Sequence, residues 1–423
     1  MAWLCAVAGL VFVVCVIGWL AVSFFVGVVV FALGIAATIA LHEFGHMRSA
    51  LACGMVVRRF YVGFGPTVFK VRRGGIEYGL KAIPLGGFCD IAGMTIHDEL
   101  GEVPADKAMV NKPAWQRVFV LLGGILMNLL LAFVLIYAVA VSVGLPNRDA
   151  DFSAVVESTG CVAPAQNEDG SLAPCAGEGP AAAAGMRAGD KVVAVDGQPV
   201  ESFMQLREKL MEKPGQTVQL EVQRGAETLS LSVPLESVTR RSTSGEVITV
   251  GAAGIVGARP SNTMVEYNPL SAVGGAARFY GMMFEGTVKG LVAFPGKIPG
   301  VMASVVGAPR DEESPMSVVG ASRIGGELAQ QSQWPTFVML LASLNFFLAL
   351  FNLLPFPPLD GGHIAVVVYE KLRDAWRRMR GLAPAGPADY LKLMPLTYAV
   401  TAALLLVGVV TIAADIVNPI RLF

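Results

Sequence analysis

The chain has little charge and few histidines. Asp, Glu, Lys and Arg make up 15% of its 423 residues, whereas hydrophobic residues make up 54%. Soluble domains carry about 25% charged residues, and this chain gathers its apolar residues into long runs. The net charge of −1 argues against nucleic-acid binding, which needs a basic face. The composition therefore predicts a membrane protein with one modest soluble domain.

Four runs are long enough to cross a bilayer, which takes about 20 mostly apolar residues. They are Ala2–Leu41, Val118–Leu145, Thr336–Phe356 and Leu396–Ile416. The first run has no charged residue, and as one helix it would measure about 60 Å, twice the hydrocarbon thickness. Three explanations stay open: the run folds back near residues 18–25, its first part is not a span, or residues 1–21 precede the true start.

Basic residues predict the orientation of the spans. Lys and Arg are dense in residues 48–117 and 363–394, so both segments should be cytoplasmic by the positive-inside rule. Residues 146–335 form a segment long enough to be translocated regardless of its charge. Cys161 and Cys175 share this exterior segment, and we expect them to form a disulfide there; two free thiols are the alternative.

The most specific motif is His42-Glu43-Phe44-Gly45-His46, at the end of the first run. Residues four apart share one face of a helix, so His42 and His46 can both bind one zinc ion. Glu43 can take a proton from a zinc-bound water and deliver it to the leaving amine. Ionisable groups beside so long an uncharged run are costly unless they are functional. A structural cluster without a metal is the alternative.

A catalytic zinc takes a third protein ligand and keeps its fourth position for water. The chain has four His, and the other two are His97 and His363. Asp360 is the better candidate, because it follows a proline-rich break at the end of the third run. Irregular backbone at membrane depth is tolerated only against protein or a water-filled cavity. The alternative is that Asp360 only forms the turn before Gly361.

The pair of motifs HEFGH and NLLPFPPLDGG, with a domain between them, resembles the site-2 protease family of intramembrane zinc proteases. The resemblance is closest to the actinobacterial branch that acts on anti-sigma factors. It extends from about Val22 onward, whereas the N-terminal lead departs from the family. Three further motifs carry it: GFGP at 63–66, PLGGFCDIAGM at 84–94 and NPIRLF at 418–423.

This resemblance implies roles for individual residues. His42, His46 and Asp360 would bind one Zn²⁺, and Glu43 would be the catalytic base. Asn352 would line the cleft and hydrogen-bond the backbone of the substrate. An Asn that pairs two membrane helices is the alternative for that position.

The segment after the first span is predicted to form a β-hairpin. Thr67–Arg72 and Ile76–Ile83 flank Gly74-Gly75, which is a hairpin signal. In the family such a hairpin dips into the membrane beside the active site, where its edge could hold an unwound substrate by strand addition. An ordinary cytoplasmic hairpin is the alternative.

The exterior domain, residues 151–258, resembles a PDZ domain in its AGMRAGD and KVVAVDG motifs at 184–197. We expect its helix at Ser202–Lys213 and two strands after it. A candidate carboxylate-binding loop around Gly254 follows these strands, which suggests the circularly permuted arrangement of the family. Such a domain could recognise an exposed C-terminus or exclude substrates with bulky ectodomains.

The expected fold is a polytopic α-helical membrane protein with about four transmembrane helices, a membrane-associated β-hairpin region and a mixed α/β PDZ-like extracytoplasmic domain. The expected divisions are an N-terminal transmembrane region (1–47), the re-entrant β region (48–117), the second transmembrane helix (118–145), the PDZ-like domain (151–258), a linker with membrane-surface segments (259–335), the third transmembrane helix (336–362), a cytoplasmic segment (363–395) and the fourth transmembrane helix (396–417).

The expected function is a zinc endopeptidase of the inner or plasma membrane, with HEFGH near the cytoplasmic side. Its substrates would be single-pass membrane proteins, anti-sigma factors by resemblance, already trimmed by an upstream site-1 protease. The rival hypotheses are a non-catalytic PDZ-containing adaptor and a metal transporter. An adaptor has no use for Glu43 beside a metal, and a transporter should show polar residues in several spans.

Overall fold

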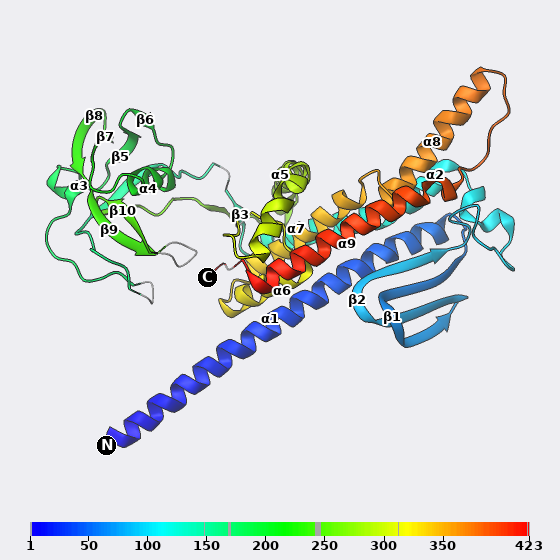
Figure 1. Ribbon diagram of the computed structural model, residues 1–423, viewed down its shortest axis with the longest axis horizontal. Helices are drawn as coiled ribbons and strands as arrows, with labels where there is room; N and C mark the ends of the chain where they lie inside the picture. The colour runs from blue at the N-terminus through cyan, green and yellow to red at the C-terminus, as the bar shows by residue number, and fades with distance from the viewer. Residues whose placement is uncertain are drawn as a thin grey trace. The chain divides into compact units, whose positions relative to one another are not determined.

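The computed structural model describes residues 2–147, 149–167, 171–241, 247–311, 313–420 and 422, with side chains described outside 2–22 and 84–85. The chain divides into two compact units (Figure 1). Met1–Val143 and Glu266–Phe423 form a helical unit, named the membrane unit below. Gly144–Val265 form the second, named the β-rich unit.

The membrane unit is built from long helices. They are α1 (Ala2–Ala52), α2 (Ala114–Ser142), α5 (Pro269–Val305), α6 (Val318–Gln330), α7 (Trp334–Asn352), α8 (Asp360–Met379) and α9 (Met394–Val417), with 3₁₀ turns at Ala105–Lys107, Met109–Asn111 and Tyr390–Leu393. Four stretches of the described residues are long and apolar enough to cross a membrane: Ser23–Ala52, Ala114–Ser142, Trp334–Asn352 and Tyr390–Val417. The predicted polytopic membrane protein is confirmed at this level.

The first hydrophobic run forms one continuous helix, α1. The run therefore does not fold back near residues 18–25. The part of α1 whose side chains are described begins at Ser23 and is long enough by itself to span a bilayer. The role of residues 1–21 lies outside the described side chains.

Helices α1 and α2 approach each other at glycine. A Cβ atom on Gly45 would lie 2.2 Å from the carbonyl oxygen of Gly123, so neither position has room for a side chain. Small residues let the backbones of membrane helices come close. This contact brings the HEFGH turn of α1 against the middle of α2.

The segment expected to be a linker contributes two helices, α5 and α6, to the membrane unit. Helix α6 is mostly buried, and its Gly325 and Gly326 pack against Phe31 and Val28 of α1. Helix α5 packs through Tyr280, whose ring meets Phe346 of α7 at 4.7 Å between centroids. Glycine and alanine in α6 allow this close packing without the long apolar run that marks a span.

The hairpin strands are longer than predicted, β1 being Val57–Arg73 and β2 Ile76–Ile91. Both strands bend, so Phe60 in the first half of β1 pairs with Tyr78 and with Cys89 from the two halves of β2. The second half of β1 pairs with the first half of β2, and these two halves are joined directly by the Gly74-Gly75 turn. The far end of β2 lies against the C-terminal end of α1 (Figure 1).

The β-rich unit is organised around one antiparallel sheet of order β11-β4-β5-β7-β8, with β6 beside β5. Its elements are β3 (Leu145–Pro146), β4 (Ala154–Thr159), α3 (Pro180–Ala183), β5 (Lys191–Val195), β6 (Gln198–Pro199), α4 (Phe203–Met211), β7 (Thr217–Arg224), β8 (Glu227–Pro234), β9 (Glu236–Arg241), β10 (Val247–Ala252), β11 (Ile255–Gly257) and β12 (Met264–Val265).

Alternation along β7 positions the core of this unit. Val218, Leu220 and Val222 are fully buried, and the residues between them point away from the core, as the period of two in a strand requires. Leu206 of α4 is also fully buried and belongs to the same cluster. The side chain of Ser202 accepts a hydrogen bond from the Gln205 N–H and caps α4.

Candidate metal centre

Three potential metal ligands from α1 and α8 meet in the membrane unit. The ligand atoms of His42, His46 and Asp360 all lie within 4.8 Å of one another. Asp360 Oδ2 lies 3.2 Å from His42 Nε2 and 3.3 Å from His46 Nε2. The two imidazole Nε2 atoms are 3.1 Å apart. Both histidines are buried, and Asp360 is largely buried.

Local sequence explains how each ligand reaches this point. His42 and His46 are four residues apart in α1 and therefore share a helix face. Asp360 is the first residue of α8, after the proline-rich break that follows α7. Glycine after it is required by space, because a Cβ on Gly361 would lie 2.3 Å from the Leu353 carbonyl oxygen. The break thus folds back closely onto the start of α8.

Helix α2 forms the wall of the cluster. A Cβ on Gly124 would lie 2.4 Å from His46 Nε2 and 2.7 Å from His42 Nε2. The carbonyl oxygen of Val120 lies 2.8 Å from His46 Nδ1, and the side chain of Asn128 lies 3.2 Å from His42 Nδ1. Positions 120, 124 and 128 recur every fourth residue and share one helix face. This face engages both Nδ1 atoms and leaves space at both Nε2 atoms.

The donor set fits a divalent cation. His46 Nδ1 donates to the Val120 carbonyl oxygen, so its Nε2 carries a lone pair. His42 Nε2 carries one as well when the Asn128 amide is turned so that its Oδ1, which has no partner among the described residues, accepts from His42 Nδ1. Two lone pairs then face the carboxylate oxygen at the distances above. Asp360 Oδ2 is buried and has no hydrogen-bond partner among the described residues. Such an arrangement is repulsive unless a cation lies between the three atoms. Two imidazoles and one carboxylate are also a ligand set of catalytic zinc sites.

Glu43 lies on α1 beside this cluster, partly exposed. The β2 strand passes it closely, because a Cβ on Gly87 would lie 3.1 Å from Glu43 Cγ and 2.9 Å from the Tyr61 carbonyl oxygen. A carboxylate and an adjacent strand therefore face the same side of α1. This arrangement can supply a base for a water molecule and a backbone edge for an extended peptide.

The two other histidines do not belong to the group of ligand atoms. His363 is on α8 and stacks on Tyr390 at 5.7 Å between centroids. His97 Nε2 lies 2.9 Å from Asp389 Oδ1. Asn352 is half-buried at the end of α7.

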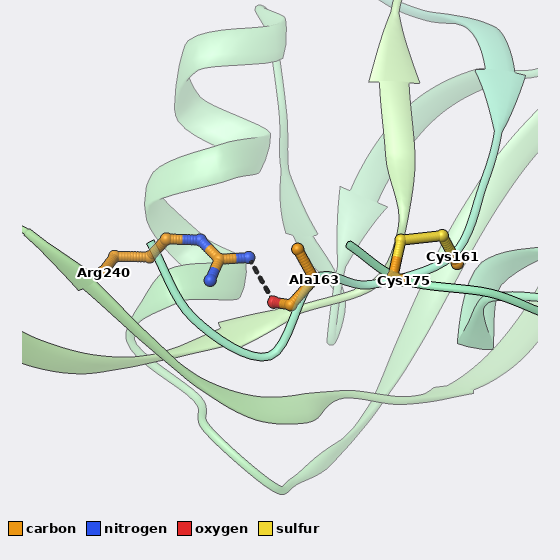
Figure 2. Close-up of a disulfide and its surroundings, with 4 residues drawn as sticks. All are labelled: Cys161, Ala163, Cys175 and Arg240. Atoms are coloured by element: carbon orange, nitrogen blue, oxygen red, sulfur yellow. Dashed lines mark hydrogen bonds between the residues drawn. A yellow bond between two sulfur atoms is a disulfide. The ribbon is translucent and has the colours of Figure 1, made fainter. Parts of the chain in front are cut away.

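The candidate residues of the β-rich unit lie outside this centre. Gly254 has a φ of +73° just before β11. A Cβ at that position would lie 2.1 Å from the Gly160 carbonyl oxygen. Cys161 and Cys175 form a disulfide in the same unit (Figure 2).

Comparison with known proteins decides the family. The model of Peptidase family M50 matches residues 30–383, a range that contains all three candidate ligands. The chain belongs to peptidase family M50. Zinc metalloprotease Rip1 of Mycobacterium tuberculosis is 45% identical over 95% of this M50 chain and 99% of its own length. Metalloprotease MmpA of Caulobacter vibrioides is 27% identical over 80% of this chain and 85% of its own length.

Membership of family M50 confirms the enzyme class predicted above. The protein is a zinc metalloprotease of the site-2 protease type, embedded in a membrane. The adaptor and transporter hypotheses lose their support, since the match extends across nearly the whole sequence.

Two features of this M50 site were not found from the sequence. Gly124 and Asn128 lie in the second span, and Asn128 is fully buried. The signal for Asn128 was a lone polar side chain inside an apolar helix, which is costly without a partner. Asn345 shows the same signal, but its side chain donates to Thr38 Oγ1 instead. Only the packing of the helices distinguishes these two asparagines.

Proposed function

We propose that His42, His46 and Asp360 hold the catalytic zinc of this M50 protease and that Glu43 is its general base. The observation that supports this most is the convergence of three ligand atoms within 4.8 Å beside the space left by Gly124. The ion, when bound, supplies Lewis acidity for the hydrolysis of a peptide bond. Glu43 accepts a proton from the attacking water and returns it to the leaving amine nitrogen.

The far half of β2 is proposed to hold the substrate near Glu43. A helical peptide bond is shielded by its neighbours, so the substrate segment must be extended before water can attack it. Strand addition to a free backbone edge stabilises such an extended segment. The close approach of Gly87 to Glu43 supports this role. Asn352, at the start of the proline-rich break, would donate to the substrate backbone from the other side.

The proposed substrates are single-pass membrane proteins already trimmed by another protease, with anti-sigma factors as the expected class. The membrane-embedded site favours a scissile bond in or near a transmembrane segment. The cut would release a fragment into the cytoplasm, since the basic segments 48–117 and 363–394 predict that HEFGH lies near that side.

The β-rich unit is proposed to be a circularly permuted PDZ-like domain outside the cytoplasm. Its antiparallel sheet and α4 support the fold, and the Cys161–Cys175 disulfide supports an oxidising compartment. The free cysteines with described surroundings, Cys53 and Cys89, lie in the membrane unit. Gly254 would belong to the loop that faces a ligand.

The proposal is tested by comparing the wild type with Glu43→Gln in membranes that contain a pre-trimmed single-pass reporter. The released cytoplasmic fragment is quantified, and zinc is measured by mass spectrometry in the same purified samples. We expect the fragment only with Glu43 and one zinc per protein molecule in both samples. Equal release by both proteins would exclude Glu43 as the base.

A further inference from the structure

A buried ion pair joins α2 to α8 beyond the proposed metal centre. Arg117 Nη1 donates to Glu370 Oε2 at 2.6 Å, and the two side chains are only 7% and 8% exposed. Arg117 is the only charged residue in α2. Charged side chains inside membrane-spanning helices are rare and commonly have a function, so this pair calls for a physical explanation.

Stability alone does not explain the pair. Moving two charges out of water costs much of what their attraction returns, and apolar residues of similar volume are often as stabilising. A charged pair instead demands a defined geometry. Glu370 meets this demand from two sides, because its other oxygen, Oε1, accepts a hydrogen bond from the Ala388 N–H at 2.7 Å.

Arg117 lies on the face of α2 that forms the wall of the metal centre. Positions 117, 120 and 124 are spaced by three and four residues, so they share one side of the helix. The Val120 carbonyl oxygen contacts His46 Nδ1, and Gly124 leaves room at both imidazoles. The ion pair therefore lies about two helical turns from Gly124 on the same face.

Glu370 belongs to the helix that begins with Asp360. It lies about 15 Å further along the axis of α8, at 1.5 Å per residue. Between these two residues, Val367 is buried in one cluster with Val120 and Leu121 of α2. Helix α8 therefore packs along the wall-forming face of α2 from Val367 to the ion pair.

The stiffness of a helix connects the ion pair to the metal centre. Backbone hydrogen bonds fix the rise per residue, so a displacement of α8 at Glu370 moves Asp360 by a similar distance. A metal site tolerates errors of only about 0.2 Å in its ligand distances. The proline-rich break holds the near end of α8 through the close approach of Gly361 to the Leu353 carbonyl oxygen, and the ion pair holds the far part.

We propose that Arg117 and Glu370 are positioning residues for the metal centre. Their ion pair fixes the register of α8 on α2 and thereby places Asp360 opposite the two imidazoles. The inference rests on the proposed function, because it takes Asp360 as a zinc ligand. Both residues act through Asp360.

The test measures zinc affinity on the purified full-length protein without substrate, by competition against a chelator of known affinity. Glu370→Gln keeps the shape of the side chain and removes the charge that holds Arg117. We expect zinc to bind about tenfold more weakly, the lower end of the range typical for residues that support a ligand. An affinity within about twofold of the wild type would refute the positioning role.

Asp415→Asn is the matched control for a loss of stability. Asp415 forms another buried ion pair, with Arg310 at 2.6 Å and side-chain exposures of 2% and 3%, respectively. It lies in α9, which carries no proposed ligand. Both variants should lower the thermal unfolding midpoint, since each leaves a buried arginine without its carboxylate. Only Glu370→Gln should weaken zinc binding, and an equal loss in both variants would reduce the role of Glu370 to stability.

Cobalt(II) provides a second measurement, because its visible spectrum depends on the geometry of its ligands. The spectrum of cobalt-loaded Glu370→Gln should differ from that of the wild type, whereas the spectrum of Asp415→Asn should match it. An unchanged spectrum in Glu370→Gln would show that the ligands are still in place and would overturn the proposal.

A double-mutant cycle tests whether Glu370 acts through Asp360. Asp360→Ala removes the proposed ligand, so adding Glu370→Gln in that background should lower zinc affinity no further. The same loss in both backgrounds would contradict action through Asp360. Unchanged zinc affinity in Asp360→Ala alone would instead overturn the ligand assignment of the proposed function, so the two failures are distinguishable.

Discussion

Replacing Asn128 with Leu separates the positioning of His42, a proposed metal ligand, from the packing of α2. Asn128 is fully buried, with Nδ2 3.2 Å from His42 Nδ1, while its Oδ1 has no partner among the described residues. A half-turn of the amide exchanges these two atoms, so that Oδ1 accepts the proton of His42 Nδ1. His42 Nε2 then carries the lone pair that a zinc ligand needs.

The expected loss of zinc affinity follows from the hydrogen-bond donor on His42 that the substitution would leave without an acceptor. The Nδ1–H of His42 would lose its acceptor in a buried site, at a cost of about 1–3 kcal/mol. Loss of the outer partner of a ligating histidine typically lowers metal affinity about 10- to 100-fold, which corresponds to about 1.4 to 2.8 kcal/mol. The two estimates agree, so we expect Asn128→Leu to bind zinc 10- to 100-fold more weakly, about one to two decades.

The assay is a competition for zinc against a chelator of known affinity, made on the purified protein without substrate. Asn128→Asp should retain tight binding, because a carboxylate also accepts the proton of Nδ1. Asn345→Leu is the matched control, since it removes another fully buried amide from a span, one that contacts Thr38. Its zinc affinity should stay within about twofold of the wild type. Unchanged zinc affinity in Asn128→Leu would refute the positioning role.

Three further predictions concern other parts of the protein. Gly124→Ala should abolish stoichiometric zinc binding, because its Cβ would lie 2.4 Å from Nε2 of His46, a proposed ligand. Gly408→Ala, whose Cβ would have no atom within 4 Å, should leave zinc binding unchanged; measuring the zinc content of both purified variants tests this. Asp190 is buried, and a hydrogen bond from Arg224 lowers the pKa of the Asp190 carboxyl group. The pair therefore stabilises the folded state fully above the unfolded pKa of an Asp, about 3.9. This stabilisation is lost as the pH falls through the lower pKa that Asp190 has in the folded state. Asp190→Asn should cost about 1–3 kcal/mol at neutral pH, and calorimetry should show a flatter pH dependence; an identical profile would contradict this. After reduction of intact cells, a membrane-impermeant maleimide should label Cys161 and Cys175; labelling only after lysis would place the β-rich unit inside.

Several parts of this protein could be predicted from the sequence because they depend only on interactions within one segment. A bilayer requires about 20 apolar residues per span, so composition alone located the spans now seen as parts of α1, α2, α7 and α9. The 3.6-residue period of a helix requires His42 and His46 to share a face. Gly74-Gly75 marked the hairpin turn, and both residues have positive φ in the structure.

Packing between distant segments decided what those local rules could not. The pairing of each half of β1 with different halves of β2 depends on how the strands bend, and the turn residues do not encode it. Helix α6 escaped recognition because its small residues become favourable only against the side chains of α1.

The sequence by itself determined the spans, a motif of the metal-binding type and the position of Glu43 next to His42. These features depend only on helical periodicity and on the length of an apolar run, which are properties of one continuous segment. Only the tertiary structure decided that Asp360 Oδ2 lies beside both Nε2 atoms and that Gly124 and Asn128 face the same point. These contacts depend on the approach of α1 to α2 at Gly45, and such an approach between distant helices leaves no periodic trace in either one.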